Sequence, residues 1–294
     1  MNRVYDYIIA GIRLRSDIDL VEAGLRGFRL FATEEATETA DCHIHINNDL
    51  TEELYGVSEE LSTSYVLEAD ADSRFMRTPD GYMYAIKRRM EGAATTLFHI
   101  NTTTNSITTN IATHDGIDIS IMRFVIWVMF GVVMAPMGGV AIHSSCITCD
   151  GAAILFLGEA GTGKSTHTRL WRENITGARL LNDDSPIVRV VDGVARVYGS
   201  PWSGKTPCYK NEDYPIAGFC RLAQAPYNKI QRLPTILAIG ALLPSCPPLF
   251  AHDERLQDMM CATIGKVISK TPLYRLECLP NAAAAELSRT TILG

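Results

Sequence analysis

A glycine-rich loop that directly follows an apolar segment is the feature that most constrains the fold of this chain. Residues 158–166 read Gly-Glu-Ala-Gly-Thr-Gly-Lys-Ser-Thr, and residues 152–157 before them read Ala-Ala-Ile-Leu-Phe-Leu. Glycines permit a backbone whose N–H groups face phosphate oxygens, and a helix that begins at the loop presents its positive end to the same anion. The pattern predicts a buried strand, a phosphate-binding loop and a helix, and it indicates a site for a nucleoside triphosphate.

The side chains of this loop have separate expected roles. Lys164 would place its charge at the terminal phosphates, and Ser165 would offer a hydroxyl to a Mg²⁺ that bridges them. The alternative is an ordinary glycine turn without a ligand. The residues expected to bind the nucleotide are Gly158, Gly161, Thr162, Gly163, Lys164, Ser165 and Thr166.

Three further side chains are candidates for the chemistry of this site. Asp183 and Asp184 follow an apolar pair about twenty residues after the lysine, where one could coordinate Mg²⁺ while the other accepts a proton from an attacking hydroxyl. The alternative is a solvated turn, since Asn-Asp-Asp-Ser-Pro is also good turn composition. His143 lies about fifteen residues before the loop, and a catalytic or metal role competes there with ordinary structural hydrogen bonding.

Charge and cysteine content narrow the class of protein. The 294 residues carry a formal net charge of −6, which argues against a nucleic-acid or anionic-membrane partner. The eight scattered cysteines are typical of reduced thiols, and no secretion signal is evident at the start of the sequence, so we expect a cytoplasmic protein. Cys146 and Cys149 are expected to be buried thiols rather than zinc ligands, because no second ligand pair stands at finger spacing.

The chain divides by pattern into two portions. Residues 1–117 alternate in short segments rich in Thr, Ile, Tyr and Val, which predicts a mainly antiparallel, β-rich portion that would recognise a substrate or partner. A meander over 82–87, 95–100 and 106–111 and a short helix over 17–27 are expected there. Residues 118–294 predict an α/β nucleotide-binding core. The uncharged stretch 124–142 is interrupted by glycines and a proline, so it predicts a buried helix and a strand rather than a membrane span.

The remaining elements of the second portion follow from local pattern. Helices are predicted over 165–173, 256–269 and 282–291, and strands over 187–191, 195–198 and 274–278.

The order of three motifs resembles a known group of kinases. Ile-His-Ser-Ser at 142–145, the loop at 158–166 and Leu-Leu-Asn-Asp-Asp at 180–184 are similar to the core of bacterial HPr kinase/phosphorylases and of ATP-dependent phosphoenolpyruvate carboxykinase. The resemblance implies a carboxykinase-type P-loop fold over residues of about 140 to 190. It also implies that Lys164 contacts the β- and γ-phosphates, that Ser165 and one of the two aspartates hold Mg²⁺, that Asp183 is the general base, and that His143 lies beside phosphate or metal.

The chain also departs from both families. The Glu-Ile-x-Gly stretch of typical HPr kinases is not evident, which argues against HPr itself as substrate. The substrate-gripping basic motifs of carboxykinases are also not evident, so decarboxylation is not expected. Trp202 and Lys205 occupy the region where the Glu-Ile-x-Gly stretch would stand and are candidates to contact the substrate, with an exposed turn as the alternative. Lys229 and Arg232 could add positive charge to the transition state.

These observations favour an ATP-dependent kinase that uses Mg²⁺, or Mn²⁺ in its place, to move the γ-phosphoryl group to a hydroxyl of a small molecule or a peptide or protein serine. Two alternatives stay open: a non-catalytic ATP-binding module that docks a partner, and a phosphorylase that works in the reverse direction. The HPr kinase habit of assembling into hexamers suggests a homo-oligomer.

Overall fold

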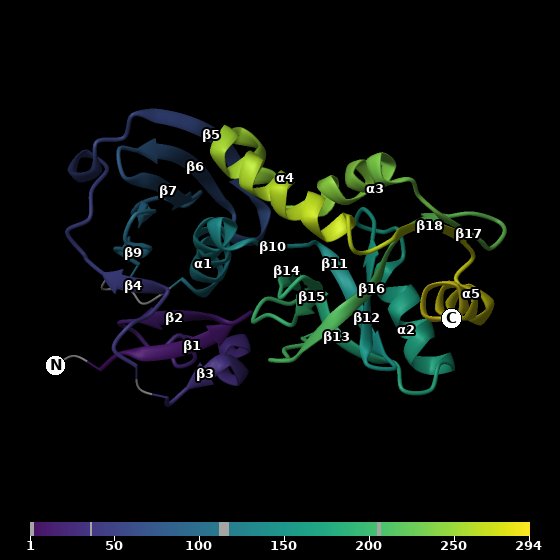
Figure 1. Ribbon diagram of the computed structural model, residues 1–294. Helices are drawn as coiled ribbons and strands as arrows, with labels where there is room; N and C mark the ends of the chain where they lie inside the picture. Colours follow the sequence, from purple (N-terminus) through teal and green to yellow (C-terminus); the bar gives the residue numbers. More distant parts are fainter. Residues whose placement is uncertain (1–2, 36, 112–117, 205–206) are drawn as a thin grey trace. The chain divides into compact units, whose positions relative to one another are not determined.

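The computed structural model describes residues 3–35, 37–111, 118–204 and 207–294. Within these residues the chain forms two compact units, each built on a large mixed β-sheet with few helices (Figure 1). The first unit comprises residues 1–136 and 251–254, and the second comprises residues 137–250 and 255–294. The division at 136/137 is later than the boundary at 117/118 expected from the sequence, because the first long helix belongs to the N-terminal unit.

In the described part of the first unit, nine strands follow the order β3-β1-β2-β4-β9-β8-β7-β6-β5. β4 pairs in parallel with both β2 and β9, and the remaining pairs are antiparallel. The β7, β8 and β9 meander expected from the sequence is confirmed. The strands are β1 (Tyr5–Ile9), β2 (Ile12–Ser16), β3 (Ala32–Thr33), β4 (Cys42–Ile46), β5 (Glu59–Val66), β6 (Ala71–Thr78), β7 (Gly81–Arg88), β8 (Thr96–Asn101) and β9 (Ser106–Thr109).

The prediction of a short helix over residues 17–27 is wrong. The chain forms turns there, because the Asp19 carboxylate accepts hydrogen bonds from the backbone N–H groups of Val21 and Glu22. Aspartate commonly forms such local bonds in turns. A single 3₁₀ helix follows at Arg26–Phe31.

Helix α1 (Ile119–Met134) begins at Asp118, whose carboxylate accepts hydrogen bonds from the N–H groups of Ser120 and Ile121. The helix is apolar almost all round and most of its residues are buried, as expected for a core helix rather than a surface one. By length and composition the segment 119–137 could cross a membrane, yet two thirds of it is buried within the protein. The structure therefore shows the buried helix that the sequence predicted, and the short strand β10 (Gly139–Ala141) follows it.

The described part of the second unit also holds nine strands, arranged around the twelve-residue strand β16 (Asp213–Gln224). The first residues of β16 pair with β15, and its later residues lie between β12 and β18, both of which run parallel to it. The other strands are β11 (Ser144–Cys149), β12 (Ala152–Leu157), β13 (Arg179–Asp184), β14 (Ile187–Val191), β15 (Val194–Tyr198), β17 (Lys229–Arg232) and β18 (Leu273–Cys278).

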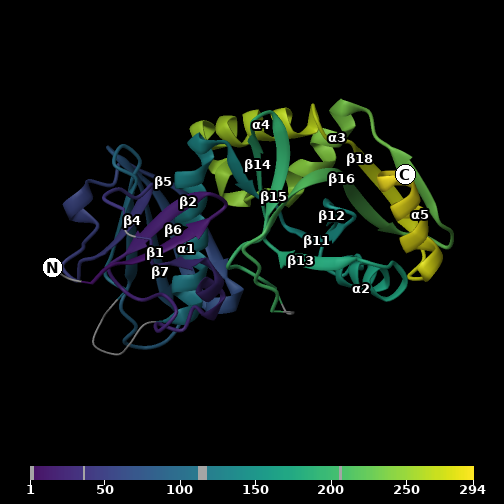
Figure 2. The same cartoon turned by 60° about the horizontal axis from the view of Figure 1, so that its bottom comes forward.

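Four α-helices complete this unit where it is described: α2 (Lys164–Asn174), α3 (Thr235–Leu242), α4 (Glu254–Ile268) and α5 (Ala282–Leu293). The predicted helices near α2, α4 and α5 are confirmed. Figure 2 shows α3 and α4 on the side of the sheet opposite to α2.

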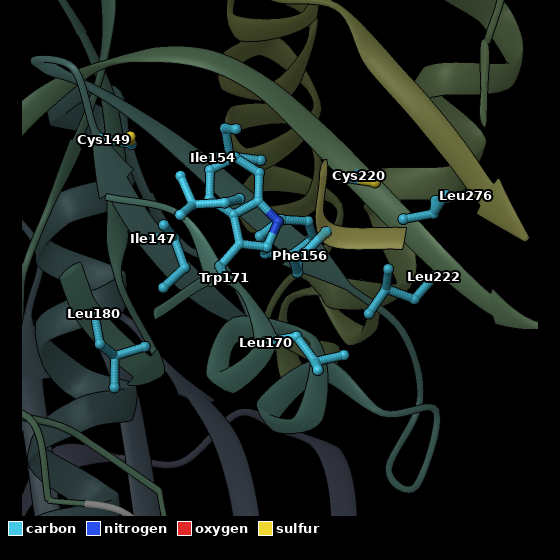
Figure 3. Close-up of a cluster of buried hydrophobic side chains, with 12 residues drawn as sticks. Ile147, Cys149, Ile154, Phe156, Leu170, Trp171, Leu180, Cys220, Leu222 and Leu276 are labelled. Carbon is cyan, nitrogen blue, oxygen red and sulfur yellow. The ribbon is translucent and has the colours of Figure 1, made fainter. Parts of the chain in front are cut away.

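Helix α2 is fixed to the sheet by Trp171, which is fully buried among Phe156 and other apolar side chains (Figure 3). The Trp171 indole N–H donates to Ser288 Oγ at 2.9 Å, which joins α2 to α5. The helix that follows the glycine-rich loop is therefore packed against both the sheet and α5.

Candidate nucleotide site

The glycine-rich loop connects β12 to α2 in a compact turn. Gly158 and Gly163 have φ angles of 150° and 102°, where L side chains are disfavoured. A Cβ atom at Gly158 would lie 2.4 Å from Thr162 Oγ1. The loop then leads into α2 at Lys164, and the first N–H groups of a helix have no partner within it. The structure thus has the predicted order of a strand, a glycine-rich loop and a helix whose first N–H groups adjoin the loop.

Lys164 lies at the centre of the candidate site. Its Nζ donates to the Gly158 carbonyl at 2.6 Å and lies 3.2 Å from His143 Nε2. Burial lowers the pKa of Lys164, and the nearby carboxylates of Asp183 and Asp184 oppose that shift. A charged ammonium has only donors, so we assign His143 Nε2 as an acceptor.

His143 connects Lys164 to Asp184. Its Nδ1 lies 3.2 Å from Asp184 Oδ1, so with Nε2 accepting from Lys164 the proton of a neutral imidazole is on Nδ1 and points at the carboxylate. Ser245 fixes the backbone of His143, because its carbonyl accepts the His143 N–H at 2.6 Å. About half of the imidazole surface is exposed, which leaves the ring accessible to a ligand.

Asp183 faces a different set of groups from Asp184. Ser145 donates to its Oδ1, and the Ser165 hydroxyl lies 3.4 Å from its Oδ2. Ser165 and Asp183 therefore present two hard oxygen donors close together, a pair that fits a shared Mg²⁺. Asp184 has a φ of 149°, which is unusual for a residue with a side chain and stores backbone strain at this point.

Two residues of β16 complete the surroundings of the loop and were missed by the sequence analysis. Arg221 is paired in register with Leu157, the last residue before the loop, and its Nη2 lies 3.0 Å from Glu159 Oε1. Gln224 donates to the Gly161 carbonyl at 3.1 Å. The alternation in Phe-Cys-Arg-Leu-Ala-Gln at 219–224 was the available signal, but a preceding proline and glycine obscured the strand.

A pocket of about 610 Å³ adjoins the loop. One wall is the loop and the first turns of α2, and the opposite wall is formed by the ends of β16 and β18. The residues that line it are Gly161, Thr162, Gly163, Thr166, His167, Leu170, Leu222, Gln224, Ala225, Cys278, Leu279 and Pro280. Its mainly apolar lining beside a phosphate loop is typical of a small-molecule site.

The four residues proposed to contact the substrate or to add positive charge have different positions. Trp202 is buried, and its carbonyl accepts from Asn182 Nδ2 at 2.9 Å, which favours the alternative of a tryptophan that anchors the turn. Arg232 is exposed on β17, which β18 and β16 separate from β12, so at ordinary strand spacing it lies about 14 Å from the loop strand. Lys229 is on the same strand. Lys205 is outside the described residues.

Both cysteines of the Cys146/Cys149 pair are buried, and burial raises the pKa of each thiol, as expected for inert structural thiols. All eight cysteines are free.

The site therefore brings together His143, Lys164, Ser165, Asp183 and Asp184, residues that are up to 41 positions apart in the sequence. The sequence matches no model of a known protein family, and it matches no curated protein. The geometry of the site consequently carries the functional argument alone.

Proposed function

We propose that the protein is an ATP- and Mg²⁺-dependent phosphotransferase of the HPr kinase-like, carboxykinase-type P-loop group. The observation that carries the proposal is the contact chain Lys164–His143–Asp184 at the phosphate loop, beside the Ser165–Asp183 pair. A protein that only binds a nucleotide needs no titratable pair next to the terminal phosphates. Phosphoryl transfer does need one, since the acceptor hydroxyl loses its proton.

The contacts of each residue suggest a separate role for it in phosphoryl transfer. Loop N–H groups and Lys164 bind the phosphates, and Ser165 with Asp183 would hold Mg²⁺, which neutralises charge on the phosphate oxygens when it is bound. The acceptor oxygen forms a bond to the γ-phosphorus, the bond from that phosphorus to the β–γ bridging oxygen breaks, and ADP leaves. Asp184 takes the hydroxyl proton on Oδ2, while His143 Nδ1–H donates to Oδ1 and holds the carboxylate in place.

This division differs from the expectation that Asp183 is the general base. Both oxygens of Asp183 already face hydroxyl groups, whereas the contact described for Asp184 is the imidazole. The two assignments predict different kinetics. Under our proposal, Asp183→Asn raises the Mg²⁺ concentration needed for activity, and Asp184→Asn lowers kcat with an unchanged Mg²⁺ requirement. If Asp183 is the base, the pattern reverses.

The adjoining pocket would hold the nucleobase. Its lining is continuous with the loop through Gly161, Thr162 and Gly163, and the far wall is apolar, as a stacked or packed base requires. Exposed Leu279 lies on this wall and offers a position that can be changed without disturbing the core.

The first experiment measures ATP turnover with Mg²⁺ in the presence of a metabolite and peptide extract of the source cell. Lys164→Ala should lower extract-stimulated turnover by ~10³-fold, because a charge at the transferring phosphoryl group is lost. Lys270→Ala removes an exposed lysine outside the site and is the matched control.

Two other results would redirect the assignment. Tight ATP binding without turnover in every extract would favour the non-catalytic module. A phosphorylated acceptor that releases pyrophosphate when it is incubated with inorganic phosphate would favour the phosphorylase direction. The reduced cysteines accord with a cytoplasmic enzyme.

A further inference from the structure

A cluster of two histidines and one aspartate lies on the sheet of the first unit, within the chain's N-terminal 46 residues. His43 and His45 alternate along β4 with the buried side chains of Cys42 and Ile44, so both imidazoles project from the same face. Asp17 directly follows β2, the parallel neighbour of β4, and its N–H donates to the Ile44 carbonyl at 3.0 Å. The sheet itself thus positions all three side chains.

The three side chains converge on one point. Asp17 Oδ1 lies 2.8 Å from His43 Nε2, and Asp17 Oδ2 lies 3.3 Å from His45 Nδ1. The two imidazole rings are tilted against each other with centroids 3.7 Å apart. One donor atom from each of the three residues can be chosen so that all three atoms lie within 4.8 Å of one another.

We propose that Asp17, His43 and His45 form a binding site for a divalent transition metal of the Zn²⁺ type. Two imidazole nitrogens and one carboxylate oxygen are a donor set that suits such ions and is poorly suited to Mg²⁺. Tetrahedral ligands at zinc bond lengths are about 3.4 Å apart, so the observed separations need only small side-chain movements. Each of the three side chains is partly exposed, so an ion can enter and a further position stays open to water.

The neighbouring charges permit a cation at this point. Arg15 of β2 is paired in register with His43. Its guanidinium makes a bidentate ion pair with Asp6, in which both N···O distances are 2.8 Å. Asp6 also pairs with Arg13, which pairs in turn with Glu35, so the two arginines and the two carboxylates balance in charge. On the other side, Ser106 and Thr108 of β9 are the uncharged register neighbours of the two histidines.

The test is a Co²⁺ and Zn²⁺ titration of the full chain, freed of metal by a chelator and kept in excess MgCl₂ so that hard-cation sites are filled. We expect one Zn²⁺ per chain. Co²⁺ should give visible d–d absorption without the near-ultraviolet band of a cobalt–thiolate bond, which distinguishes this site from the cysteines. His45→Ala removes a ligand and Asp17→Asn removes the negative charge of a ligand, so each should weaken Zn²⁺ binding by ~100-fold or more.

The matched control is His252→Ala, which removes an exposed histidine outside the cluster and should leave the affinity unchanged. Circular dichroism verifies that each variant is folded, and half-exposed His45 is the variant least expected to disturb the sheet. Thiolate absorption in the Co²⁺ protein, no stoichiometric binding by the wild type, or equal affinity in wild type and both cluster variants would each overturn the proposal.

Discussion

The two units of this protein both rest on mixed nine-stranded sheets over their described residues, yet they place polar chemistry in different ways. In the second unit, the candidate groups stand where strands end, and the backbone there has a positive φ at Gly158 and is strained at Asp184. In the first unit, His43 and His45 stand within a regular strand and Asp17 extends the ladder beside it. A nucleotide loop requires an unusual backbone, whereas a metal cluster on a strand face requires only the right side chains in register.

The difference predicts unequal sensitivity to small changes of the backbone, and Gly158→Ala should have the largest effect. The new Cβ would meet Thr162 Oγ1 at 2.4 Å, at a φ that disfavours side chains, so loop geometry must shift. We expect ATP and tripolyphosphate affinity to fall by ~100-fold to ~1,000-fold, about 3–4 kcal/mol, in isothermal titrations.

Gly177→Ala is the matched control for that variant, because Gly177 also has a positive φ, of 80°, but a Cβ there would meet open space. It should cost stability by about 1 kcal/mol and leave nucleotide affinity unchanged. Zn²⁺ affinity of the first unit should be the same in both glycine variants. Equal ATP affinity in Gly158→Ala and wild type would show that the glycine-rich loop is not the binding element.

The stability of the two units should also depend differently on pH. His167 should make the second unit lose stability at mildly acidic pH. His167 is buried against Ser288 Oγ, and burial lowers its pKa to about 4 from the usual 6.5. Between these values the unfolded chain binds more protons than the folded one, so stability falls as the pH drops from 6.5 to 4. The expected loss is about 3 kcal/mol.

The measurement is chemical denaturation followed by tryptophan fluorescence, since Trp171 donates to the same Ser288 hydroxyl. His167→Gln should flatten the dependence of the unfolding free energy on pH in that window. Identical pH slopes for wild type and variant would mean that His167 is not the group responsible.

In the first unit, burial also lowers the pKa of His43 and of His99, and Asp118 at the start of α1 adds a response at lower pH. Burial would raise the pKa of this carboxyl, but hydrogen bonds from Arg88, Ser120 and Ile121 outweigh it and lower the pKa to about 2 from 3.8. The stabilisation is present above pH 3.8 and is lost as the pH falls through 2. It amounts to about 2 kcal/mol.

Asp118→Ala should therefore lower the unfolding free energy at neutral pH by about 2 kcal/mol, measured by urea denaturation. The corresponding cap in the second unit is Asn281, whose side chain accepts from the Ala284 N–H at 3.0 Å. Asn281→Ala should cost about 1 kcal/mol with no acid dependence of its own. If Asp118→Ala and Asn281→Ala lower the unfolding free energy equally and with the same pH dependence, the expected difference between the units is wrong.

The difference between local motifs and long-range strand pairing also explains which features could be predicted from the sequence. The loop and the acid pair were proposed from local signatures and His143 from the order of motifs in the resemblance, and the apolar periodicity of α2, α4 and α5 located those helices closely. Arg221 and Gln224 were missed because their relation to the loop depends on β16 pairing with β12. The paired residues are 63 or 64 positions apart, and the pairing has no local signal. Two structural units were expected, but their boundary depended on the packing of α1.

The cluster of Asp17, His43 and His45 could not have been predicted from the sequence. His-x-His on a strand is a weak pattern, and Asp17 lies 26 residues before His43. Only the parallel register of β2 and β4 brings the three together. Trp202 had two interpretations from the sequence, a substrate wall or an anchor of the turn, and its burial favours the anchor.

The smallest predicted effect separates the two halves of the proposed nucleotide site. Leu279 lines the pocket and is 37% exposed, so Leu279→Ala removes apolar surface from the nucleobase wall without opening the core. We expect ATP affinity to fall by about fivefold, near 1 kcal/mol, because three carbons no longer pack on the base. Tripolyphosphate has no base, so its affinity should stay the same.

Comparing ATP with tripolyphosphate distinguishes a loss of contacts to the base from a loss of contacts to the phosphates. Gly158→Ala should weaken ATP and tripolyphosphate together, whereas Leu279→Ala should weaken ATP alone. Leu237→Ala, at a 57% exposed leucine of α3 that is not part of the pocket lining, controls for the loss of a surface leucine. If Leu279→Ala binds both ligands as the wild type does, the base lies elsewhere. Parallel losses for both ligands would instead mean that the pocket wall supports the loop rather than the nucleobase.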